Sequence, residues 1–335
     1  MIARLTDRLA DLLPMAAARI VLGVMWLASL LWKLPFDFEA AGEKKGLREW
    51  LQLEVENPTF GFYGDLIDSL VLPNFTFFAW LIFLTELAVG VALVLGIFVR
   101  PAALVGLLMS VNLWVGLKSV PGEWHWTYLL MAMLHIAVLL ARSSLQWSAA
   151  AVLPAGLHRL SSSGESLFGV AGESRSGSLA ITILRVGLGV LTLDTWRGNI
   201  SNDFYDGDSF AGFFDWVAQP VEEGGNGASL GFVHSLIDAT IGQQPELFGW
   251  MFTVLELLIA VGLIFGVFTR AASLAAIGFF GSLFLTYFGG EEWIGIYILL
   301  TLAPIMIFLH WGGRFLGVDR YIARIRGESP GTLIW

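Results

Sequence analysis

Two glutamates occupy matching places inside long apolar stretches of the chain. Glu86 lies in WLIFLTELAVGVALVLGIFVRPAAL, which spans Trp80–Leu104, and Glu256 lies in WMFTVLELLIAVGLIFGVFTRAASL, which spans Trp250–Leu274. At a fixed offset of 170 residues, ten of these 25 positions are identical, the two glutamates among them. A carboxylate surrounded by about 20 apolar residues is costly in a bilayer and usually marks an ion, proton or ligand site. Glu86 and Glu256 are therefore the candidate catalytic residues.

A basic residue at the same depth is the expected partner of Glu86. Glu86 precedes Arg100 by 14 residues, which corresponds to about 21 Å along a helix. Lys33 follows Arg19 by the same 14 residues. If both arginines lie near one membrane surface, Lys33 and Glu86 reach the same level. We therefore predict that they form an ion pair, which would keep the carboxylate ionised.

The second apolar stretch has a similar arrangement, and we predict that Arg197 pairs with Glu256. Three roles stay open for such pairs. They could fix the register of neighbouring helices, or form the polar floor of a cavity that opens outward. Alternatively, the glutamate side chain could extend to the membrane surface and have no further role.

Other basic and aromatic residues flank these stretches. Arg100 and Arg270 should close two tight helical hairpins, while Arg19 and Arg185 should extend to lipid headgroups. Tryptophans near span ends usually form an aromatic belt, although their rings could also line a flat slot for a quinone. The candidates for binding a substrate or cofactor are Lys33, Arg197, Trp80, Trp250, Arg100 and Arg270. Close helix packing is expected at Gly23, Gly90, Gly96, Gly189 and Gly266.

The composition indicates that most of the chain lies in a membrane. Of 335 residues, 56% are hydrophobic and only 14% are charged, with a mean hydropathy of +0.72. Soluble domains carry about 25% charged residues. The absence of cysteine excludes disulfides, cysteine-ligated iron–sulfur clusters and thiol relays. We therefore predict an all-α, polytopic membrane protein.

Eight transmembrane spans are expected from apolar runs of bilayer length. They lie near Met15–Leu34, Phe75–Phe98, Ala102–Lys118, Trp126–Arg142, Leu179–Trp196, Leu247–Phe268, Ala271–Phe288 and Trp293–Trp311. Because each half holds four spans, both halves enter the membrane in the same direction. The sequence thus predicts an internal repeat of two tandem four-helix bundles, related by a pseudo-two-fold axis along the membrane normal.

The expected domains follow this repeat. A first four-helix unit covers residues 1–142, and a Ser/Gly-rich cytoplasmic linker covers 143–178. A second unit covers 179–322, and residues 323–335 form a C-terminal tail. In the long segments between spans, LREWLQLEV and LGFVHSLIDATI have the apolar spacing of short helices.

Basic residues predict the orientation in the plasma membrane. Thirteen of the 19 Lys and Arg residues fall on the side of the N-terminus, the linker and the tail, so both termini should be cytoplasmic. The outer segment Phe36–Pro73 carries eight acids and three basic residues, and Gly198–Pro245 carries seven acids and none. This acidic character and the low lysine content favour a high-salt environment.

Metal and haem sites are not expected. His135 lies in the middle of a span and His310 near the end of another, whereas a bis-histidine haem needs two imidazoles at matched depth. His234 has no metal-site spacing around it. Phosphate-loop and Ser-His-Asp patterns are also missing, and no feature predicts a nucleic-acid partner.

Several motifs carry a family resemblance. Arg19-x3-Gly23, Trp32-Lys33 and a second helix of the form E-x9-G-x3-R-x-A, together with the ending GRFLGVDRYI at Gly313–Ile322, make both halves similar to the DoxX/DoxD family. The resemblance implies a membrane subunit like that of thiosulfate:quinone oxidoreductase, with a quinone and a redox partner subunit. It also implies functional polar residues at Glu86, Arg100, Glu256 and Arg270. The first half lacks the GVDR element at Ala141–Leu153, so it should be unable to perform the role of that element alone.

Three functions therefore stay open. The chain could be a quinone-interacting subunit of a membrane oxidoreductase, with no covalently bound cofactor. It could instead be a non-catalytic assembly or anchoring subunit, or a small-molecule transporter. Thiosulfate itself is disfavoured as a substrate because the acidic outer segments would repel a dianion.

Overall fold

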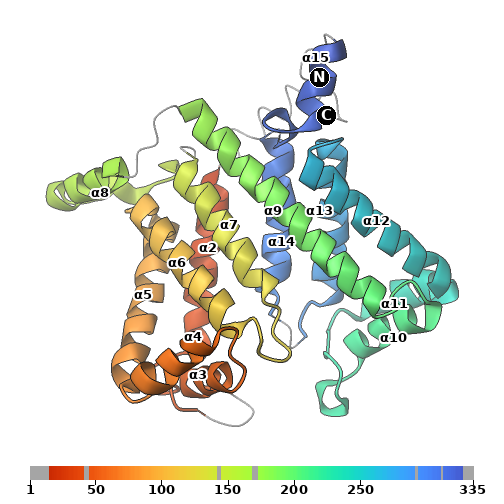
Figure 1. Cartoon of the computed structure of the whole chain (residues 1–335), viewed down its shortest axis with the longest axis horizontal. Helices are drawn as coiled ribbons and strands as arrows, with labels where there is room; N and C mark the ends of the chain where they lie inside the picture. The colour runs from red at the N-terminus through yellow and green to blue at the C-terminus, as the bar shows by residue number, and fades with distance from the viewer. Residues whose placement is uncertain are drawn as a thin grey trace. The chain divides into compact units, whose positions relative to one another are not determined.

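The chain is helical throughout its described parts. The computed structural model describes residues 15–40, 45–141, 145–167, 173–290, 293–310 and 312–326, and no strand occurs within these ranges (Figure 1). Helices satisfy every backbone polar group within one segment, which is the requirement for an apolar chain in lipid. The predicted all-α class is confirmed.

Among the described residues, six helices are long and apolar enough to cross a membrane. They are α2 (Met15–Ser29) with its extension η1 (Leu30–Trp32), α5 (Phe75–Leu95), α6 (Val99–Leu117), α9 (Glu173–Ser201), α12 (Pro245–Phe265) and α13 (Thr269–Thr286). The apolar helices α7 (Trp126–Leu140) and α14 (Gly295–Leu309) have 15 residues each, about 22 Å at 1.5 Å per residue. The chain is thus a multi-pass membrane protein. Its count of eight spans remains a prediction.

Short helices fill both long segments between the spans. The first contains α3 (Leu47–Glu56), α4 (Gly61–Leu66) and the π-helix η2 (Ile67–Val71). The second contains α10 (Gly207–Ala218), η5 (Val221–Glu223), α11 (Gly231–Thr240) and η6 (Ile241–Gln243). The helices predicted at LREWLQLEV and LGFVHSLIDATI are confirmed as α3 and α11, and α10 is an additional helix.

The described residues separate into two compact units, the first ending at Ala180 and the second beginning at Ile181. In the first unit, α2 and α6 each pack against α5 and α7. In the second unit, α13 packs against α12 and α14, and α10 packs against α12. Each unit therefore packs its glutamate-bearing helix, α5 or α12, against neighbouring helices of one bundle.

Glycines allow the closest of these helix contacts. A Cβ atom at Gly23 of α2 would lie 2.8 Å from the backbone nitrogen of Val94 in α5. In the second unit, a Cβ atom at Gly189 of α9 would lie 2.8 Å from the backbone nitrogen of Ile264 in α12. Because such contacts are too short for any larger side chain, the close packing predicted at Gly23 and Gly189 is confirmed.

Further helices follow the last span of each unit. The segment predicted as a linker contains η4 (Ala149–Val152) and α8 (Ala155–Leu167), and the second unit ends with η7 (Gly312–Arg314) and α15 (Val318–Arg326). Of the predicted tail, residues 327–335 lie outside the described residues.

Candidate functional site

A buried ion pair lies inside the first unit. The Nζ atom of Lys33 is 2.5 Å and 2.7 Å from the two carboxylate oxygens of Glu86. Ser29 donates a further hydrogen bond of 2.9 Å to Oε2 of the same carboxylate. Lys33 is 4% exposed and Glu86 is 1% exposed, so the pair is shielded from solvent. The predicted Lys33–Glu86 pair is confirmed.

Local structure explains how these three side chains meet. Glu86 lies 11 residues after the start and nine before the end of α5. It shares the buried face of that helix with Ala79, Gly90 and Leu93, which occur at helical spacing. On the other side, α2 ends at Ser29, and the 3-10 turn η1 places Lys33 directly after it. Ser29 and Lys33 therefore approach Glu86 from one side.

The second unit buries its glutamate with a different partner. Glu256 is 2% exposed and accepts a hydrogen bond of 2.9 Å from the side-chain amide of Asn199. Arg197 does not pair with it: the Arg197 side chain is 73% exposed and lies 3.7 Å from Asp194. The predicted Arg197–Glu256 pair is therefore wrong.

Helix geometry explains the error. Lys33 follows Arg19 by 14 residues, and Asn199 follows Arg185 by the same 14 residues, whereas Arg197 comes two residues earlier. Two residues correspond to about 200° around a helix, so Arg197 points away from the face that carries Asn199. A constant spacing from the arginine, rather than a match of Trp-Lys with Trp-Arg, would have identified Asn199. Ser29 and Asn199 are the site residues that sequence reasoning missed.

Arg19 and Arg185 are buried and donate to backbone carbonyls instead of reaching lipid. Arg185 is fully buried, and its Nη1 donates to the carbonyls of Leu263 at 2.5 Å and Ile264 at 3.1 Å. Arg19 is fully buried as well, and its Nη2 donates to the carbonyl of Trp147 at 3.1 Å. The expectation that both arginines extend to headgroups is wrong, because both side chains are buried against backbone carbonyls. For Arg185, these are carbonyls left free at the end of α12.

Gly96 and Gly266 are the C-cap residues of α5 and α12 and lie beside Arg19 and Arg185, instead of allowing two helices to approach each other. Both are C-cap residues with positive φ, 69° for Gly96 and 64° for Gly266, a conformation that glycine adopts without strain. A Cβ atom at either position would also collide with the guanidinium of Arg19 or Arg185. The expectation of simple helix packing at these two glycines is therefore corrected.

The arginines of the two hairpins, Arg100 and Arg270, lie away from the glutamates along the chain. Arg100 and Arg270 lie in the first turns of α6 and α13, and Glu86 is nine residues, roughly 14 Å, from the end of α5. Arg270 is 1% exposed and its guanidinium lies 4.3 Å from the centre of the Phe308 ring. Arg270 is therefore a buried residue at the turn between α12 and α13.

The two candidate tryptophans lie on another face. Trp80 is 42% exposed and Trp250 is 50% exposed. Each precedes its glutamate by six residues, about 240° around the helix, so the tryptophan and the buried glutamate do not share a face. Trp80 contacts the rings of Phe38 and Phe83, whose centres lie 5.8 Å and 5.9 Å away. This exposure fits a lipid-facing aromatic residue.

A buried histidine extends the polar interior of the first unit. The indole nitrogen of Trp26 donates a hydrogen bond of 2.9 Å to Nε2 of His135. The imidazole is fully buried and packs against Gly106. Among the described residues, no group of three or more His, Cys, Asp or Glu side chains could hold a metal ion.

An acid on the short helix α3 is also buried. Glu54 is 6% exposed and its carboxyl packs against Gly116 of α6. Burial raises the pKa of Glu54 to about 7, and the nearby Tyr63 hydroxyl opposes this shift to a smaller degree. Glu54 lies on the same face as Leu47 and Leu51, while the corresponding face of α10 carries only the apolar side chains of Phe210, Phe214 and Val217 and the glycine Gly207.

The GVDR element of the second unit has a capping role. Asp319 accepts hydrogen bonds from the backbone N–H groups of Phe268 at 2.7 Å and Thr269 at 2.9 Å, at the start of α13. In the first unit, Ser161 of α8 accepts a bond of 3.1 Å from the N–H of Phe98, at the start of α6. The first unit therefore has a different cap at the matching hairpin, a serine hydroxyl with one hydrogen bond, and its lack of the further role of the GVDR element stays a prediction.

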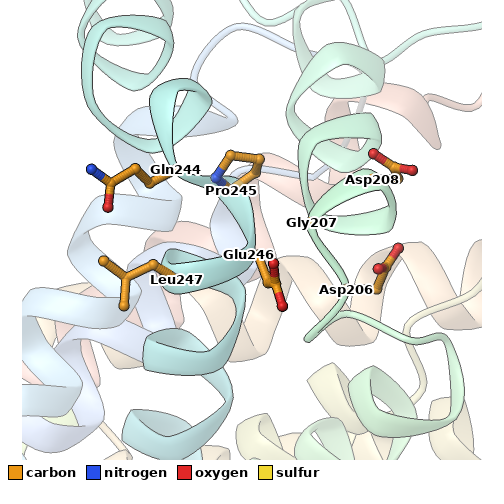
Figure 2. A pocket seen from close by; sticks show the side chains of 7 residues that line it. All are labelled: Asp206, Gly207, Asp208, Gln244, Pro245, Glu246 and Leu247. Carbon is orange, nitrogen blue, oxygen red and sulfur yellow. The ribbon is translucent and has the colours of Figure 1, made fainter.

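A separate acidic pocket lies in the second unit. It has a volume of about 470 Å³ and lies where α10 and α12 begin (Figure 2). Its lining has three carboxylates and no basic residue, and Asp206 also caps the first turn of α10 through the N–H of Ser209. The lining residues are Asp206, Gly207, Asp208, Gln244, Pro245, Glu246 and Leu247.

Comparison with known proteins identifies the first part of the chain. The DoxX family profile matches residues 15–119, a range that includes Ser29, Lys33 and Glu86. No curated protein and no solved structure matches the chain. Residues 15–119 are therefore similar to the DoxX family, and the chain is a multi-pass membrane protein with a DoxX-like segment.

Proposed function

We propose that this protein is the quinone-interacting subunit of a membrane oxidoreductase, with Lys33, Glu86 and Ser29 as the anchor for the quinone headgroup. The observation that supports this proposal is the buried ion pair in the middle of the first bundle. It lies within the segment that matches the DoxX family. A buried pair of charges is weak support for stability alone, so a ligand role gives a reason for it.

The chemistry of the three side chains suits a quinone. Quinone carbonyl oxygens accept hydrogen bonds, and the ammonium of Lys33 and the hydroxyl of Ser29 are donors. Two-electron reduction of a quinone also consumes two protons. These would come from the aqueous phase, and the Glu86 carboxylate would take them up and pass them on one at a time. The electrons would come from a redox partner subunit.

We do not extend the proposal to thiosulfate as the electron donor. The outer segments are rich in acids, and the pocket of the second unit presents Asp206, Asp208 and Glu246 without a basic residue. Such a surface repels a dianion at moderate salt concentration.

We also propose that the two units are copies of one four-span bundle and that both termini face the cytoplasm of a plasma-membrane protein. Support comes from the matched positions of Glu86 and Glu256, each 11 residues after the start of a 21-residue helix. The distribution of basic residues supports the orientation.

Organic extraction of the purified protein, followed by mass spectrometry, tests the quinone proposal. Wild-type protein should carry bound quinone, Glu86→Gln should lose most of it, and the matched control Glu256→Gln should retain it. Equal loss from both variants would contradict a site in the first unit. Protein without quinone that co-purifies with a stable partner would favour an anchoring role, and solute flux into proteoliposomes would favour transport.

A further inference from the structure

The last described helix has two distinct exposed faces. In α15, Val318, Tyr321 and Ile325 are 40%, 67% and 70% exposed. They lie at spacings of three and four residues and therefore form one apolar stripe. Arg320 and Arg324 are also exposed, and Arg320 lies about 200° around the helix from Val318.

A third face holds α15 against the bundle. Asp319 is 2% exposed, and its carboxylate caps the start of α13 through Phe268 and Thr269. The helix is thereby fixed at the end of the unit where α12 ends and α13 begins (Figure 1). Since Asp319 is used in this contact, the exposed charges of α15 are all basic, namely Arg320, Arg324 and Arg326.

We infer that α15 is an interfacial helix that binds anionic phospholipids of the leaflet at which α14 ends. Tyr321 and Ile325 enter the boundary between headgroups and acyl chains, and the arginines contact lipid phosphates. Short amphipathic helices with a basic face bind membranes in this way, and basic clusters next to a span select anionic headgroups. The complementary charge, rather than the apolar stripe alone, identifies a lipid surface as the occupant.

Spin labelling tests the depth of the helix directly. The chain has no cysteine, so Ile325→Cys and Arg324→Cys each give a single labelling site in the full-length protein. In vesicles of equal parts phosphatidylcholine and phosphatidylglycerol, the label at 325 should be relaxed several-fold more by oxygen than by a water-soluble nickel chelate. The label at 324 should show the opposite preference. Equal access of the chelate to both labels, or protection of 325 from both reagents by another protein surface, would overturn the inference.

Lipid retention tests the headgroup selectivity. Phosphatidylglycerol bound per protein, measured by native mass spectrometry, should fall several-fold in the triple variant Arg320→Gln/Arg324→Gln/Arg326→Gln. The control Arg48→Gln/Arg197→Gln removes two exposed arginines elsewhere and should retain the wild-type amount. Unchanged retention in a triple variant with wild-type helicity would contradict lipid binding by α15.

Discussion

The two units bury a glutamate at the same point of comparable helices but stabilise it differently. Glu86 has an ammonium group and a hydroxyl as partners, whereas Glu256 accepts a hydrogen bond from the neutral amide of Asn199. The face of the helix thus decides that the carboxyl is buried. The residue 14 positions after Arg19 or Arg185 decides whether the glutamate lies beside a cation. We conclude that the buried glutamate of the first unit lies beside a cation, whereas the described hydrogen-bond partner of the glutamate in the second unit is a neutral amide.

The short helices α3 and α10 also differ in what they bury. In the first unit, the buried face of α3 ends with Glu54, while the buried face of α10 has Val217 at the matching place in its spacing. The first unit therefore keeps titratable groups in its interior at two levels. This contrast can be broken by exchanging single residues.

Removal of the cation should have the largest effect. Lys33→Met leaves an unpaired buried carboxylate and should lower the free energy of unfolding by about 3–5 kcal/mol, with a strong loss of folded yield. Asn199→Leu removes one neutral donor and should cost only about 1–2 kcal/mol. Titration with sodium dodecyl sulfate in mixed micelles measures both values. Equal costs would show that the two glutamates are held in the same way.

The buried acid of α3 should make the stability of the first unit depend on pH. Because the folded state raises the pKa of Glu54 from 4.5 to about 7, it disfavours the ionised carboxylate. The free energy of unfolding should therefore fall by roughly 3 kcal/mol as pH rises from 4.5 to 7 and then stay constant. Glu54→Gln should flatten this part of the profile in thermal unfolding experiments. A wild-type profile without this decrease would contradict the burial of Glu54.

The helix caps should show a smaller difference between the units. Asp319→Ala removes two hydrogen bonds from the start of α13 and should cost about 1–2 kcal/mol. Ser161→Ala removes one bond from the start of α6 and should cost about 0.5–1 kcal/mol. Hydrogen exchange of the first turns of α6 and α13 locates the effect. A larger cost for Ser161→Ala would reverse the assigned order of the two caps.

The exposed arginine should matter least. Arg197→Gln breaks only a surface contact with Asp194 and should change the free energy of unfolding by less than about 0.5 kcal/mol. A loss of several kcal/mol in the same micelle titration would mean that Arg197 reaches a buried carboxylate after all.

The sequence could predict the all-α fold and the six long apolar helices, because these follow from the lengths of the apolar segments. It could also predict the Lys33–Glu86 pair, because the pair follows from the spacing of residues along helices. The partner of Glu256 was missed by a shift of two residues, which reverses the face of α9. The carbonyl contacts of Arg19 and Arg185 and the cap formed by Ser161 could not be predicted, because their partners are up to 131 residues away in the chain and depend on how distant segments meet. The C-cap role of Gly96 and Gly266 was within reach, since each glycine ends an apolar helix just before a tight turn.

Double-mutant cycles on the free energy of unfolding test the central difference between the units most directly. The cycle of Lys33→Met and Glu86→Met should give a coupling energy of about 2 kcal/mol or more, because the double variant removes both buried charges together. The cycle of Arg197→Met and Glu256→Met should give a value within about 0.5 kcal/mol of zero. A coupling energy near zero in the first unit would contradict the buried Lys33–Glu86 ion pair. A coupling energy as large in the second unit would contradict the exposed position of Arg197.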